Sequence, residues 1–154
     1  MAMKKSLSAG LIKDFRLLDQ NGKPFHLADL KGKKVLLSFH PLAWTPVCAK
    51  QMQALEKNNK IFAKLNTIVV GISVDSVPGK KAWAKSLKIK KTGLLADFWP
   101  HGGVAKMLGI FRKEGFSERA NIILNEKGVV EFKKIYPIGQ LPDIKEIITR
   151  LKLL

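Results

Sequence analysis

The residues of this sequence that are best suited to chemistry surround its single cysteine, Cys48. Cys48 ends the stretch SFHPLAWTPVC, residues 38–48, which leads into a segment with helical periodicity. Thr45 is a favourable N-cap residue, and Pro46 suits the first position of a helix because a proline nitrogen has no hydrogen to leave unpaired. The pattern therefore predicts that Cys48 is the third residue of a helix and lies in its first turn.

The start of a helix stabilises a thiolate, because unpaired backbone N–H groups and the positive end of the helix dipole lie there. This contribution is only ~0.3–1 kcal/mol, whereas a charge-assisted hydrogen bond from arginine contributes ~1.5–3 kcal/mol. A reactive Cys48 therefore requires a nearby cation. Of the four arginines, Arg119 opens the apolar segment RANIIL and would be held by a strand. From these residues alone, a reactive thiolate and an inert buried cysteine both remain open.

Composition limits the class of protein. The chain has 154 residues, of which 46% are hydrophobic, and we expect one domain spanning residues 1–154. No apolar run is long enough to cross a bilayer, and the stretch MAMKKSLSAGLIKDF lacks the continuous apolar segment of a signal peptide. We therefore expect a cytoplasmic protein without membrane contact, which agrees with a lone cysteine. Because no histidine pair has metal-ligand spacing, we expect no metal.

The net charge of +16 raises the question of nucleic-acid binding. The lysines are spread in small clusters, without an aromatic RNA-binding signature, zinc-finger spacing or a long basic tail. We therefore expect no specific nucleic-acid partner and interpret the lysines as a solvated surface. A basic nucleic-acid-binding protein on a reused fold remains an alternative, because a fold alone does not determine a function.

The remaining sequence predicts the elements that must position Cys48. Hairpins are expected across Asn21-Gly22 and across residues 125–128. Apolar and β-branched runs predict strands, and apolar periodicity predicts helices. The strands are expected at 33–39, 66–75 and 93–98, and the helices at 45–65, 77–87, 101–111 and 142–154. This alternation predicts an α/β fold with helices packed on the faces of a sheet.

Three aromatic side chains near these elements have a predicted position. Because neighbouring residues of a strand face opposite sides, the ring of His40 is expected to point away from Cys48. Trp83 has apolar partners at helical spacing, so we expect it in the core or in an interface. Trp44 is expected either to line a pocket or interface or to pack within its loop.

The motif Pro41-x-x-x-Thr45-x-x-Cys48, after the run VLLSF, resembles the active-site motif of the peroxiredoxins, the alkyl hydroperoxide reductase and thiol-specific antioxidant family. Arg119 falls on the family's active-site arginine. The resemblance covers nearly the whole chain and includes, in order, AGLIKDFRLLDQNGKPFHLADLKGKKVLLSFHP, GISVDSVPGKKAWAKSL, LLADFWPHGGVAKMLGIF and ERANIILNEKGVVEF. It implies a thioredoxin-like fold, with a central mixed β-sheet flanked by helices and an N-terminal β-hairpin.

The resemblance also implies an enzyme, a thiol-dependent peroxidase that reduces hydrogen peroxide or organic hydroperoxides. Cys48 would be the redox-active nucleophile, whose thiolate attacks the terminal peroxide oxygen and becomes a sulfenic acid. Arg119 would stabilise the thiolate and the leaving oxygen. The hydroxyl of Thr45 would hydrogen-bond the peroxide or the thiolate, and Pro41 would shield the sulfenic acid. The family analogy implies a homodimer and no cofactor.

The sequence departs from the family pattern in two ways. Gln51 stands where many members have glutamate, and it keeps an amide acceptor without the charge. There is no second cysteine, so the chain resembles the 1-Cys type, and an external thiol must reduce the sulfenic acid. This thiol would be a thioredoxin- or glutaredoxin-type protein or a small molecule. The alternative function is a redox sensor or chaperone-like binding protein, in which oxidation of Cys48 changes partner binding.

Overall fold

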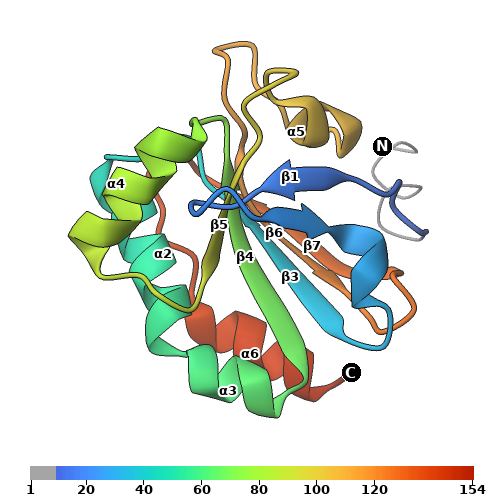
Figure 1. Cartoon of the computed structure of the whole chain (residues 1–154). Helices are drawn as coiled ribbons and strands as arrows, with labels where there is room; N and C mark the ends of the chain where they lie inside the picture. The colour runs from blue at the N-terminus through green and yellow to red at the C-terminus, as the bar shows by residue number, and fades with distance from the viewer. Residues whose placement is uncertain (1–9) are drawn as a thin grey trace.

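The computed structural model describes residues 10–154 and contains a seven-stranded sheet with the order β2-β1-β5-β4-β3-β6-β7 (Figure 1). The strands are β1 (Arg16–Leu18), β2 (Pro24–His26), β3 (Lys34–Phe39), β4 (Thr67–Ser73), β5 (Gly93–Ala96), β6 (Arg119–Leu124) and β7 (Val130–Tyr136). Strands β3, β4 and β5 run parallel to one another, and the other neighbours are antiparallel. The predicted mixed sheet and both predicted hairpins are confirmed.

Six short helices accompany the sheet in the described part of the chain. They are η1 (Leu27–Leu30), a 3-10 helix that the sequence did not reveal, α2 (Pro46–Lys57), α3 (Asn59–Lys64), α4 (Val77–Leu87), α5 (Gly103–Met107) and α6 (Ile144–Lys152). The prediction of a single helix over 45–65 is wrong, because the helix is interrupted at Asn58, between α2 and α3. The side-chain amide of Asn58 donates to the Ala54 carbonyl at 2.8 Å and competes with backbone hydrogen bonding there.

Successive residues of β3 alternate between two hydrophobic layers. On one face, Val35, Leu37 and Phe39 pack with residues of the N-terminal hairpin and α5. On the other face, α2, α4 and α6 cover the sheet (Figure 1), and their buried side chains meet Leu36 of β3: Met52, Trp83 and Ile147. Of the two predicted positions for Trp83, the core or an interface, the structure shows the core.

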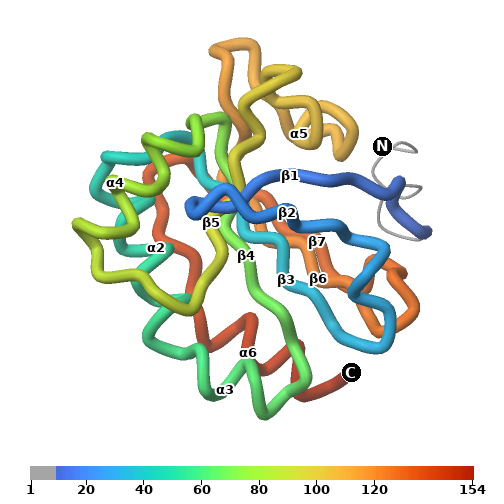
Figure 2. The backbone as a smooth tube through the Cα atoms, viewed as in Figure 1, coloured from blue at the N-terminus to red at the C-terminus, as the bar shows by residue number. Residues whose placement is uncertain are grey.

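Helix α2 packs very closely against strand β4. Gly71 of β4 faces Met52 of α2, and a β-carbon at Gly71 would lie only 2.2 Å from the Met52 sulfur. Glycine therefore permits the close approach that holds α2 against the sheet. Because β3, β4 and β5 are parallel, their carboxyl ends lie at one edge of the sheet, and the chain passes from that end of β3 into α2 (Figure 2).

Within residues 10–154, no helix has the length and apolar character needed to cross a bilayer. In the same range, no group of three or more His, Cys, Asp or Glu side chains could hold a metal ion. The expectation about an N-terminal signal rests largely on residues 1–9, which lie outside the described residues.

Candidate active site

Cys48 is the third residue of α2, as predicted. Thr45 is the N-cap residue with extended backbone (φ −118°, ψ 148°), and Pro46 is the first helical residue. The side chain of Thr45 does not cap the helix, because its hydroxyl donates to the Leu42 carbonyl at 2.7 Å. The hydroxyl therefore closes the loop before the helix, and the first-turn N–H groups near Cys48 receive no cap from the side chain of Thr45.

A guanidinium lies against the sulfur. Arg119, the first residue of β6, is buried, and its Nη1 donates a hydrogen bond to Cys48 Sγ at 3.2 Å. Nη1 also donates to Gln51 Oε1 at 2.9 Å, and Nε donates to the Ile138 carbonyl at 2.8 Å. These bonds fix the plane of the guanidinium, so one Nη1 hydrogen remains directed at the sulfur.

Gln51 is oriented by the end of strand β3. Its Nε2 donates to Ser38 Oγ at 2.8 Å and to the Phe39 carbonyl at 3.2 Å, which turns Oε1 toward Arg119. Ser38 Oγ in turn donates to Asn121 Oδ1 at 2.7 Å. Sequence reasoning missed Ser38 and Asn121. The available signal was a polar residue inside each of two otherwise apolar strands, because buried polar groups need hydrogen-bond partners.

The polar chain continues from the sheet to α6. Asn121 Nδ2 donates to the Tyr136 hydroxyl at 3.4 Å, and this hydroxyl donates to Glu146 Oε1 at 3.0 Å. Burial, together with Glu146, raises the pKa of Tyr136 to about 12, so the hydroxyl keeps its proton. A chain of hydrogen bonds thus connects Gln51, which accepts from Arg119, with Glu146 of helix α6.

The position of His40 corrects one expectation. Its ring lies on the helix-covered face, 5.1 Å from the Trp83 ring, and its Nε2 lies 2.9 Å from Lys80 Nζ. Strand alternation gives the side of His40 only relative to a strand residue whose side is known, and that residue is Ser38. Ser38 faces Gln51 of α2, and His40, two residues further along, shares this face. The ring therefore points toward the layer that contains Cys48 rather than away from it.

The loop between β3 and α2 closes over the site. Pro41 is buried, and the Ala43 N–H donates to Asp75 Oδ2 at 2.8 Å. Trp44 is 59% exposed and adopts the left-handed conformation (φ 66°) directly before Thr45. Cys48 itself is 0% exposed. The sulfur therefore has no solvent-exposed surface in this structure.

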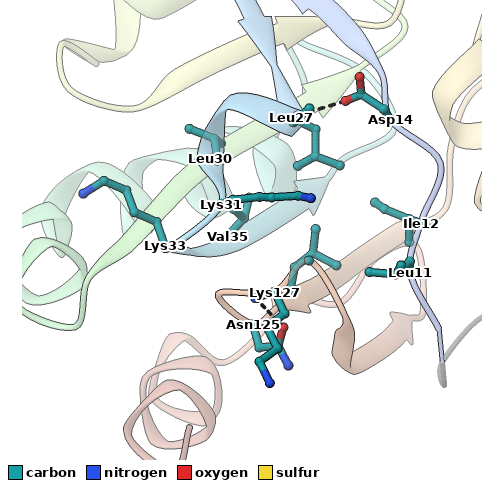
Figure 3. Close-up of a pocket in the computed structure, with 13 residues that line it drawn as sticks. Leu11, Ile12, Asp14, Leu27, Leu30, Lys31, Lys33, Val35, Asn125 and Lys127 are labelled. Atoms are coloured by element: carbon teal, nitrogen blue, oxygen red, sulfur yellow. Dashed lines mark hydrogen bonds between the residues drawn. The ribbon is translucent and has the colours of Figure 1, made fainter.

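A separate pocket of about 240 Å³ lies at the opposite end of β3 and β6 (Figure 3). Val35 and Leu124 form part of its lining, together with the apolar side chains of Ile12, Leu27 and Leu30. Three lysines also line it: Lys31, Lys33 and Lys127. Cys48 comes after the carboxyl end of β3, and Arg119 is the first residue of β6. Both therefore lie at the other ends of these strands, and the pocket is not part of the cysteine site.

Known proteins resemble this chain in sequence and structure. The AhpC/TSA family model matches residues 10–133. "Alkyl hydroperoxide reductase E" of Mycobacterium tuberculosis is 33% identical over 132 residues, covering 84% of this chain and 86% of that protein. "Peroxiredoxin 2" of Sulfurisphaera tokodaii is 35% identical over 131 residues, covering 80% of this chain and 61% of that protein.

Solved structures agree with these matches. The reduced 2-Cys peroxiredoxin of Plasmodium vivax has a TM-score of 0.87 and 25% identity, covering 94% of this chain and 80% of that one. AhpC of Enterococcus faecalis has the same TM-score and identity, with coverages of 96% and 91%. The fold is thus thioredoxin-like, as predicted. The chain belongs to the AhpC/TSA family and is a peroxiredoxin with a single cysteine, as in the 1-Cys type.

Proposed function

We propose that this peroxiredoxin reduces hydrogen peroxide or organic hydroperoxides through Cys48, and that an external thiol reduces the resulting sulfenic acid. One observation carries the proposal: Arg119 Nη1 donates a hydrogen bond to Cys48 Sγ at 3.2 Å in the first turn of α2. A guanidinium and a helix start both favour a thiolate, which is the nucleophilic form of cysteine. The name of the mycobacterial relative, an alkyl hydroperoxide reductase, also supports this substrate class.

The surrounding residues have distinct proposed roles. The thiolate attacks the terminal peroxide oxygen, and Arg119 stabilises both the thiolate and the negative charge on the leaving oxygen. The hydroxyl of Thr45, which donates to the Leu42 carbonyl in this structure, turns to the peroxide once the loop opens. Pro41, buried in the same loop, shields the sulfenic acid from solvent. A small peroxide offers little surface to bind, so the rate depends on these fixed donors.

The reductant is an external thiol because the sequence holds no second cysteine. A thioredoxin- or glutaredoxin-type protein and a small thiol both have the required chemistry. The net charge of +16 favours a reductant that carries negative charge around its thiol. The mixed disulfide between Cys48 and the first thiol is then reduced by a second thiol.

The chain acts as one cytoplasmic domain that forms a homodimer. The loops after β3 and β5 leave the same edge of the sheet, and both carry exposed aromatic side chains. Phe98 and Trp99 are 51% and 82% exposed and line a hollow of about 430 Å³ with Leu18 of β1. Exposed aromatic surface of this kind is typical of protein interfaces. We therefore place the contact between the two copies on this surface.

Mass spectrometry after stoichiometric peroxide, with and without candidate thiols, tests the proposed function. We expect sulfenic acid on Cys48 without thiol, a mixed disulfide with thiol, and repeated turnover with excess reductant. Cys48→Ser should abolish peroxide consumption. Wild-type turnover in this variant would disprove the proposed mechanism. A protein that reacts once and is not recycled by any thiol would instead be a redox sensor.

A further inference from the structure

A lysine and a histidine form a buried pair beside the cysteine site. Lys80 Nζ lies 2.9 Å from His40 Nε2, and both side chains are 0% exposed. Lys80 belongs to the first turns of α4, which begins after the N-cap Ser76. Full burial and the positive end of a helix both disfavour an ammonium ion. A cation at this position therefore requires negative charge nearby.

Two residues can supply negative charge near Lys80: Asp75, which follows β4, and Cys48 of α2. Among residues 10–154 no carboxylate forms an ion pair with Lys80, and Asp75 Oδ2 is bonded to the Ala43 N–H and to Ser73 Oγ. Burial lowers the pKa of Lys80 to about 7, whereas the charges of Asp75 and Cys48 act in the opposite direction. Negative charge that favours protonated Lys80 can therefore come from Asp75 and, when its thiol is ionised, from Cys48.

His40 is held in a fixed orientation, with its Nε2 toward the ammonium group of Lys80. Its ring packs on Trp83, and its carbonyl accepts from Ser117 Oγ at 3.3 Å. Burial lowers the pKa of His40 well below its usual value, and the charges of Lys80 and Arg119 lower it further. The ring is therefore neutral near pH ~7, and its Nε2 can accept a hydrogen bond from Lys80.

We propose that Lys80, oriented by His40, is a positioning residue of the peroxide reaction: its ammonium balances the Cys48 thiolate and gives up one proton when the thiolate becomes a sulfenic acid. The inference rests on the proposed function. It adds a second cation to the site, and unlike Arg119 this cation changes its charge with the redox state of the cysteine.

The step balances in atoms and charge. The Cys48 sulfur forms a bond to the terminal peroxide oxygen and is oxidised by two electrons. The O–O bond breaks, and its electron pair stays on the leaving oxygen, which takes up one proton and departs as water or an alcohol. The proton that Lys80 loses accounts for the proton on the leaving oxygen, so Lys80 becomes a neutral amine and the step takes no net proton from solution. When the external thiol restores the thiolate, Lys80 takes up a proton again.

The pH dependence of the reaction rate with hydrogen peroxide tests this inference. For the wild-type protein we expect the rate constant to fall as pH rises above about 7, where Lys80 loses its proton. Lys80→Met should lower the rate roughly tenfold at about pH 6 and remove the alkaline decline, since a difference of ~1.4 kcal/mol is tenfold. Lys80→Arg keeps its charge and should extend the high rate to alkaline pH. The exposed neighbour Lys81 provides the matched control, Lys81→Met, which should resemble the wild type.

A second measurement follows the proton itself, with a pH indicator in weak buffer. At about pH 6, wild-type oxidation should take up roughly one proton fewer from solution than oxidation of Lys80→Arg, which keeps its proton throughout. Equal proton uptake, or a wild-type rate and pH profile in Lys80→Met, would overturn the inference. Wild-type protein whose Cys48 does not react with peroxide at all would instead refute the proposed function. Thermal unfolding of each variant establishes that it is folded, and the wild-type profile tests the alkaline decline without any variant.

Discussion

Arg119 Nη1 lies 2.9 Å from Gln51 Oε1, so a neutral amide holds the arginine that contacts the sulfur. A carboxylate at this position would pair with the guanidinium and reduce the positive charge that the sulfur experiences. The amide provides the same hydrogen-bond geometry without that competition. The departure from the family's usual glutamate therefore leaves more of the charge of Arg119 available to Cys48.

Removal of Arg119 should slow the reaction with peroxide. Arg119→Ala removes a charge-assisted bond of ~1.5–3 kcal/mol, which corresponds to a rate loss of roughly 10- to 150-fold. The thiolate absorbance of Cys48 at a given pH should also decrease. Stopped-flow kinetics and ultraviolet titration measure the two effects. Arg150→Ala, on α6, is the control; an unchanged rate and titration in Arg119→Ala would show that another group activates the sulfur.

The role of Gln51 can be separated from the general effect of changing α2. Gln51→Ala removes the acceptor for Arg119 and the donor for Ser38, and an unsatisfied buried polar group costs ~1–3 kcal/mol. We expect a lower melting temperature and a slower reaction with peroxide. Gln53→Ala, at an exposed position of the same helix, should change neither. If both variants behave alike, Gln51 does not position the arginine.

Glu56 should make stability depend on pH at the far end of α2. Its carboxylate accepts backbone hydrogen bonds from Lys90, Lys91 and Thr92. Burial raises the pKa of Glu56, but these donors outweigh it and hold the pKa below its usual value. The carboxylate therefore contributes stability above its unfolded-state pKa, and this stability is lost as pH falls through the folded-state pKa.

Glu56→Gln should accordingly lower the melting temperature by a few degrees near neutral pH, since ~1 kcal/mol corresponds to ~2–4 °C in a chain of this size. The difference from the wild type should shrink as pH falls through the folded-state pKa of Glu56. Glu126→Gln, at an exposed position, is the control. Calorimetry across pH measures both, and a difference that is constant with pH would contradict the assigned role.

The proposed homodimer predicts a change in mass. Trp99→Glu places a charge on the most exposed aromatic side chain of the proposed contact surface and should convert a dimer into a monomer. Leu153→Glu, equally apolar and exposed but at the end of α6, should leave the mass unchanged. Light scattering after size-exclusion chromatography measures the mass. A monomeric wild-type protein would contradict the proposed homodimer.

Most of the fold could be predicted because its signals are local. Two apolar runs, two turn sequences and the Thr-Pro start of α2 each determine the structure of neighbouring residues. The break at Asn58 escaped prediction because apolar periodicity continues across it, while the decisive bond joins a side chain to the carbonyl of Ala54. The 3-10 helix η1 is a single short turn with no periodicity to detect.

The site was only partly predictable, because its contacts join residues distant in sequence. Cys48 and its helix start could be inferred from adjacent residues, and Arg119 from its place in the family motif. The hydrogen-bond partners of Ser38, Asn121 and Lys80 could not be inferred, since each pairing depends on the packing of two or three elements. The face of His40 was misjudged because alternation gives relative sides only, and the reference residue must be known.

The complete burial of Cys48 has a further kinetic meaning. A sulfur with no exposed surface can react only with molecules that reach it through local opening of the structure around it. Small peroxides should therefore oxidise the reduced protein far faster than bulky alkylating agents of comparable intrinsic reactivity. In this protein, the size of a reagent limits its reaction with Cys48 before its intrinsic reactivity toward sulfur does.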